Sequence, residues 1–159
     1  MSTFNGLPAH VLLVHFIVIL APLTAVLAIV CTFWPAARQR LVWLLLALAV
    51  ITAVLTPLTT DAGEWLEKRN GRSPLLHAHT ELGDTMAYFS IALVAAAALI
   101  AFVHFREARA KSLKPIARWL IAAVVVIASV ATTVQVYRIG DSGAKATWSE
   151  QSAVGSSTP

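Results

Sequence analysis

The sequence predicts an all-α integral membrane protein, a four-helix bundle whose two termini both lie on the extracytoplasmic side. The composition predicts the class, because the 159 residues are 58% hydrophobic and 13% charged and the mean hydropathy is +0.74. A soluble domain carries about a quarter charged residues, so this chain has too much apolar surface for one water-soluble core. Four long apolar stretches without Asp, Glu, Lys or Arg predict the number of helices.

Each apolar stretch is long enough to cross a bilayer. The stretches contain between 18 and 23 residues and cover 11–33, 41–58, 86–103 and 119–136. About 20 helical residues cross a hydrocarbon core, and only a helix satisfies its own backbone hydrogen bonds within lipid. With their flanking residues, the predicted helices run over about 8–34, 40–69, 74–106 and 115–138.

Local signals extend the second and third helices beyond the lipid. Glu64 and Lys68 have the i, i+4 spacing of a helical ion pair, so the second helix is expected to continue outward. The Asn-Gly pair at 70–71 is typical of a helix end. Ser73 and Pro74 then have the pattern of an N-cap followed by proline at the first helical position.

The segment after the fourth stretch is expected to leave the helix. Gly140 and Gly143 predict tight turns, and the charged residues Arg138 and Asp141 beside them are expected to pair with other polar groups at the same end. Residues 147–159 are small and polar, which is typical of a disordered tail. The remaining residues, 1–146, form one four-span domain.

The distribution of charge predicts the orientation. The links at 34–40 and 104–118 hold seven basic residues and one acid, whereas the opposite side holds five basic residues and seven acids. Lys and Arg are enriched in cytoplasmic loops, so the first side is expected in the cytoplasm. The net charge of +4 therefore indicates membrane orientation, and no nucleic-acid partner is expected.

Motifs exclude several classes of chemistry. Cys31 is the single cysteine of the chain, so an internal disulfide, a CxxC pair and a thioether-linked haem are excluded. The sequence has no nucleophile elbow, phosphate loop or HExxH zinc motif. We therefore do not expect the protein to be an enzyme by itself.

Histidines gather in the outer half of the predicted bundle. His15 lies within the first span, where an ionisable residue usually faces the bundle interior and has a partner. His79 is followed by Gly83, which leaves room for a flat group, and by Met86. Because haem in a helical bundle is held by side chains of facing helices, His15 and His79 are predicted to bind haem b, with His10 nearby. The alternative is a set of histidines that hydrogen-bond to neighbouring helices without a cofactor.

Acidic residues suggest a second kind of site. His77, Glu81 and Asp84 lie at i, i+4 and i+7, on one helical face. Together with Glu64 they could bind Zn²⁺ or Cu²⁺, for which imidazole and carboxylate are ordinary ligands. Asp61 shares a face with Glu64 and belongs to the same polar cluster. A solvated helix end would have the same pattern, so this alternative stays open.

Short motifs over nearly the whole chain resemble those of a family of bacterial inner-membrane proteins with four predicted helices, the domain-of-unknown-function 2231 (DUF2231) family. The motifs are Leu7-Pro-Ala-His10, Val14-His15-Phe16, Gly63-Glu64, His79-Thr-Glu-Leu-Gly83 and Ile139-Gly-Asp-Ser-Gly-Ala144. The resemblance implies a multi-pass protein of the bacterial inner membrane. Some relatives are joined to Rieske or cytochrome domains, which implies redox work.

Three functions remain open from the sequence. The first is haem b binding and electron transfer at the histidine cluster. The second is a cofactor-free accessory or scaffolding subunit of a membrane complex, and the third is binding or transport of a divalent cation. The expected partners are the lipid bilayer and either respiratory or other membrane subunits or further copies of the chain.

Overall fold

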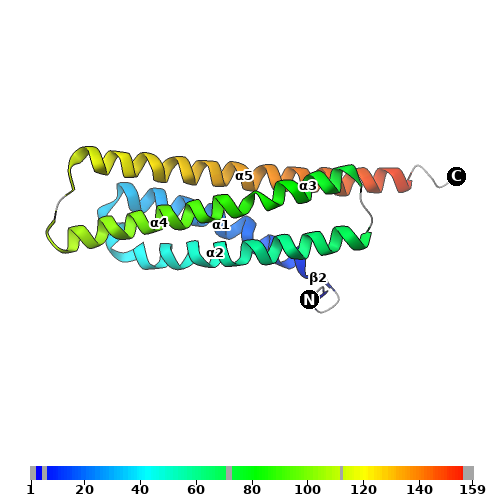
Figure 1. Ribbon diagram of the computed structural model, residues 1–159, viewed down its shortest axis with the longest axis horizontal. Helices are drawn as coiled ribbons and strands as arrows, with labels where there is room; N and C mark the ends of the chain where they lie inside the picture. Colours follow the sequence, from blue (N-terminus) through cyan, green and yellow to red (C-terminus); the bar gives the residue numbers. More distant parts are fainter. Residues whose placement is uncertain (1–2, 5–6, 71–72, 112, 156–159) are drawn as a thin grey trace.

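The computed structural model describes residues 3–4, 7–70, 73–111 and 113–155. Two short strands, β1 (Thr3–Phe4) and β2 (Leu7–Pro8), pair antiparallel before the first helix. Five helices follow and form an elongated bundle (Figure 1): α1 (Ala9–Phe33), α2 (Pro35–Asn70), α3 (Pro74–Asp84), α4 (Met86–Ala108) and α5 (Pro115–Gly155).

The predicted all-α membrane bundle is confirmed. Four segments of the described chain are long and apolar enough to span a membrane: His10–Phe33, Pro35–Arg69, Pro74–Ala108 and Pro115–Trp148. The third comprises α3 and α4, which follow one another along the same line (Figure 1). The side on which the termini lie stays a prediction from the charge distribution.

The predicted start of the third helical segment is also confirmed. The Ser73 side chain accepts a hydrogen bond from the backbone N–H of Leu76 at 3.2 Å, and Pro74 occupies the first helical turn. Ser73 therefore satisfies one of the backbone donors that a helix N-terminus leaves without a partner. Lys68 and Glu64 form the expected ion pair at 3.2 Å.

The last helix differs from the expectation. α5 continues to Gly155, past residue 138 where the fourth helix was expected to end and into the range 147–159 expected to be a tail. Gly140 and Gly143 are helical residues and form no turn. The extension packs against α3, so tertiary contact stabilises a helix that the two glycines disfavour.

The interior contains many small and hydroxyl-bearing side chains beside larger ones such as Leu93, and many large apolar side chains lie on the outside. Ala21, Ala28 and Ala97 are fully buried, as are Thr24 and Thr52. Exposed residues include Phe16, Trp43, Ile91 and Ile127, one on each of the four long helical segments. This arrangement is typical of helices that pack closely within lipid, where small residues let the backbones approach.

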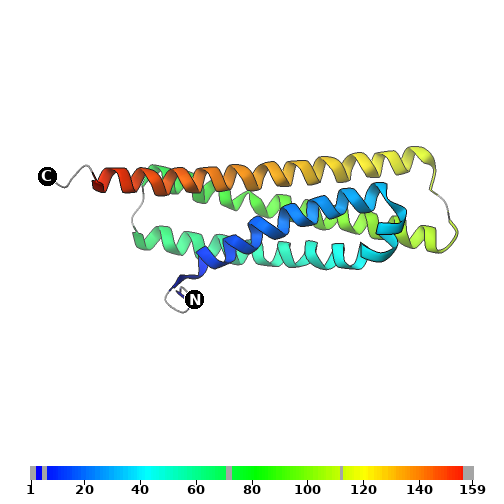
Figure 2. The same cartoon turned by 180° about the vertical axis from the view of Figure 1, so that it is seen from behind.

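The two ends of the bundle have different chemistry. The start of α1, the end of α2, α3 and the last part of α5 meet at one end, which we call the histidine end (Figures 1 and 2). The α1–α2 and α4–α5 links meet at the other, which we call the basic end. There the buried Arg38 guanidinium donates hydrogen bonds to Glu107 at 2.8 to 3.2 Å and to the carbonyl oxygens of Cys31 and Thr32.

Candidate functional site: a histidine pair in a cavity

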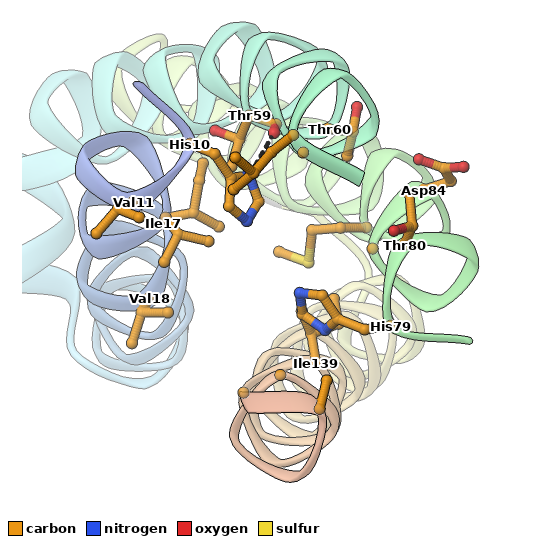
Figure 3. A pocket seen from close by; sticks show the side chains of 18 of the residues that line it. His10, Val11, Ile17, Val18, Thr59, Thr60, His79, Thr80, Asp84 and Ile139 are labelled. Atoms are coloured by element: carbon orange, nitrogen blue, oxygen red, sulfur yellow. Dashed lines mark hydrogen bonds between the residues drawn. The ribbon is translucent and has the colours of Figure 1, made fainter. Parts of the chain in front are cut away.

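A cavity of about 480 Å³ lies at the histidine end, between α1, α2, α3 and α5 (Figure 3). Its walls are mainly apolar and include Ile17, Met86 and Val136. Two histidines, His10 from α1 and His79 from α3, project into it (Figure 3). The volume is within the range of about 300–1,000 Å³ that is usual for small-molecule and cofactor sites.

His10 is oriented by the backbone of α2. Its Nδ1 lies 2.9 Å from the carbonyl oxygen of Thr59. A carbonyl oxygen can only accept a hydrogen bond, so Nδ1 carries the proton. The neutral ring then has an unprotonated Nε2, which is the form of imidazole that binds a metal.

His79 is oriented by α5 in the same way. Its Nδ1 lies 2.9 Å from Oγ of Ser142, and that hydroxyl donates its own proton to the carbonyl oxygen of Ile139 at 2.9 Å. Because the hydroxyl has one proton to donate, it accepts from Nδ1 of His79. Nε2 of His79 is therefore unprotonated as well in the neutral ring.

The two imidazoles lie opposite one another. Their ring centres are 6.4 Å apart and their planes are at 83°. Figure 3 shows one nitrogen of each ring turned toward the space between them. Two anchored imidazoles on helices that are far apart in the sequence thus present nitrogen lone pairs to the same part of the cavity.

A glycine on a facing helix lies against each ring. A Cβ added to Gly63 on α2 would be 2.9 Å from Cε1 of His10, and one added to Gly143 on α5 would be 3.0 Å from Cε1 of His79. Carbon atoms in contact are usually about 3.5–4.0 Å apart, so any larger residue would displace the ring. Gly83 also lines the cavity, and a Cβ there would have no atom within 4 Å.

The predicted pairing of His15 with His79 needs correction. His15 is exposed on the outside of α1, and its Nδ1 bonds to the carbonyl oxygen of Val11 in its own helix. His10 and His15 are five residues apart, about 140° around a helix, so only one of them can face the interior. The packing of α1 against α2 turns His10 inward.

The side chains predicted to bind a metal, those of His77, Glu81, Asp84 and Glu64, do not gather around one point. Among the residues that the structure describes, no group of three or more His, Cys, Asp and Glu side chains could hold a metal ion. Nδ1 of His77 lies 3.1 Å from Oε1 of the buried Glu67, and its Nε2 lies 3.6 Å from Oε1 of Glu81. Asp84 lines the cavity instead, while Glu64 pairs with the neighbouring Lys68.

The remaining polar residues pair locally. Asp141 accepts a hydrogen bond from Lys145 at 2.6 Å, and Arg138 contacts Oε1 of Gln135 at 3.5 Å, both within α5. Asp61 is exposed at the surface of α2. From this segment, Ser142 and Gly143 contact His79 instead.

Four contributors to the site had no predicted contact with the histidines: the Thr59 carbonyl, Gly63, Ser142 and Gly143. The last three lie in the motifs quoted for the family resemblance, and a glycine within a helical pattern often marks a close approach of another group. A backbone carbonyl leaves no mark in a sequence, and Ser142 has no distinctive spacing to His79, 63 residues earlier.

Comparison with known proteins adds one match. A protein-family model described as "Predicted membrane protein (DUF2231)" matches residues 6–156. Neither the curated proteins nor the solved structures contain a match to the chain.

Proposed function

The chain belongs to the DUF2231 family of membrane proteins, and from the geometry of its cavity we propose that it binds haem b through Nε2 of His10 and Nε2 of His79. The observation that supports this most directly is the opposed pair of imidazoles, with centres 6.4 Å apart. Two imidazoles that share one metal ion, with metal–nitrogen bonds of about 2 Å, would have ring centres roughly 6 Å apart.

The surroundings of the rings also fit haem. Each Nδ1–H is held by a protein oxygen at 2.9 Å, which is the usual way that a protein fixes the tautomer and the orientation of a metal-binding histidine. The cavity has mainly apolar walls, which suit a porphyrin. Gly83 leaves open space in one wall, and Met86 contributes an apolar thioether to another.

Haem held by His10 and His79 would supply one-electron transfer. The chain's own residues would hold the ligands and exclude water. His10 and His79 would bind the cofactor, the Thr59 carbonyl and Ser142 would orient the two rings, and the apolar walls would keep water away from it. The proposal includes a bacterial inner-membrane location, with the histidine end on the extracytoplasmic side.

A cofactor-free structural subunit is the second candidate, and one observation favours it. Each histidine connects two helices, His10 joining α1 to α2 and His79 joining α3 to α5. Hydrogen bonds of this kind hold helix ends together without any ligand. In that case the protein would act through contacts with other membrane subunits or with further copies of itself.

An absorption spectrum distinguishes the two candidates. The protein is produced with haem supplementation, purified in mild detergent and compared with His10→Ala, His79→Ala and His15→Ala. The first two variants each lack one proposed ligand. His15→Ala is the matched control, because it removes an exposed imidazole from the same helix as His10.

Haem binding predicts a Soret band for the wild type and for His15→Ala, with about one haem per chain. His10→Ala and His79→Ala are expected to lose the six-coordinate low-spin spectrum. A colourless wild type that is nevertheless folded, with His10→Ala and His79→Ala less stable, would contradict the haem proposal and favour the structural subunit.

A further inference from the structure

A second cavity, of about 390 Å³, lies at the basic end of the bundle, remote from His10 and His79. The end of α1, the start of α2, the last part of α4 and the start of α5 line it. Its lining has two parts. Arg38, Arg118 and Thr32 form a polar part, and side chains that include Phe33, Ile100 and Trp119 form an apolar part.

The two arginines of this cavity differ in how their charge is used. All three guanidinium nitrogens of Arg38 are bonded, to Glu107 and to two backbone carbonyls, and its side chain is 2% exposed. Arg118 approaches Oε1 of Glu107 at 4.0 Å, beyond hydrogen-bond distance, and is 55% exposed. Arg38 therefore offsets the Glu107 charge. The guanidinium N–H groups of Arg118 can donate hydrogen bonds to an anion.

The surrounding charge also favours an anion. The segments 34–40 and 104–118 hold seven basic residues and one acid, Glu107. Arg40, Arg109 and Lys111 are exposed there and add positive potential outside the cavity. The cavity thus combines a cationic mouth with an apolar wall, and Trp119, which is 70% exposed, has the amphipathic ring typical of the membrane interface.

We infer that this cavity binds the headgroup of an anionic phospholipid. The phosphate contacts the Arg118 guanidinium, and the first part of an acyl chain lies along Trp119 and the apolar wall. A free phosphate would use the arginine alone and leave the apolar wall exposed to water, so the lining favours a lipid. Basic pockets between transmembrane helices are known to bind anionic headgroups.

Native mass spectrometry of the full chain tests the inference. The protein is equilibrated in mild detergent with equal amounts of phosphatidylglycerol and phosphatidylcholine, and the lipids that remain bound are counted. The test variant is Arg118→Gln. The matched control is Arg40→Gln, which removes the same charge from the same end but does not line the cavity. Arg118→Lys keeps the charge and shows whether a loss reflects charge or misfolding.

The wild type is expected to retain one phosphatidylglycerol per chain in preference to phosphatidylcholine. Arg118→Gln should lower that preference about fivefold, the usual effect of one basic residue on an anionic lipid surface. Arg40→Gln and Arg118→Lys should each change it less than twofold.

Three results would overturn the inference. Equal retention of the two lipids would show that the headgroup charge is not recognised. An equal loss in Arg40→Gln and Arg118→Gln would show diffuse attraction to the basic end. A rise in melting temperature with inorganic phosphate as large as that with phosphatidylglycerol would identify an ion site that does not require a lipid.

Discussion

Replacing Gly143 by alanine tests the site through a single methyl group. The added Cβ would lie 3.0 Å from Cε1, 3.3 Å from Nδ1 and 3.4 Å from Nε2 of His79. Carbon contacts are most favourable at about 3.5–4.0 Å, so the imidazole must move by about 0.5 Å. Its Nδ1 is 2.9 Å from Oγ of Ser142, and the movement away from Gly143 lengthens that hydrogen bond.

The size of the effect follows from two opposing contributions. Alanine in place of glycine within a helix stabilises by about 1 kcal/mol. Losing most of one hydrogen bond costs about 1 kcal/mol, so Gly143→Ala should have nearly the stability of the wild type. Gly140 provides the control, because it is one turn earlier in α5 and its Cβ would have no atom within 4 Å. Gly140→Ala should therefore be about 1 kcal/mol more stable than Gly143→Ala.

Two measurements check the prediction in detergent. Thermal unfolding of the two variants gives their difference in stability, and haem titration followed at the Soret band gives their affinity. We expect Gly143→Ala to bind haem about tenfold more weakly than Gly140→Ala, since groups that orient a metal ligand typically change affinity by about 10–100-fold. Equal stability gains and equal haem affinities in both variants would refute the close packing of His79 on α5.

Three further predictions concern the other interactions. Ser142→Ala removes the acceptor for Nδ1 of His79 and should weaken haem binding about 10–100-fold; an unchanged titration would mean that the hydroxyl does not orient the ring. Arg38→Met leaves Glu107 and two carbonyls without their donor and should lower the free energy of unfolding by about 3 kcal/mol, measured by thermal or denaturant unfolding; a loss below about 0.5 kcal/mol would contradict the buried pair. A reporter that works only outside the cytoplasm should be active when it is fused after Ser73, because the basic links lie on the opposite side. Activity of a cytoplasmic reporter at the same position would contradict the proposed orientation.

The membrane class, the four spans and the start of α3 could all be predicted from the order of the amino acids. These features depend on local properties: the length of an apolar run against the thickness of a bilayer, and the capping of a helix by the side chain beside it. They hold whichever way the helices pack. The motifs also indicated the correct family and the end of the bundle where histidines gather.

Which histidine faces the interior depends instead on how the helices pack. His10 and His15 both lie at the start of α1, and the sequence favoured His15 because it is deeper in the span. The contact of α1 with α2 instead gives His10 the Thr59 carbonyl and leaves His15 outside. The same holds for Gly63, Ser142 and Gly143, whose importance depends on the helix that each one faces. A helix can turn any of its faces toward the core, and that rotation is set by contacts between residues far apart in the chain.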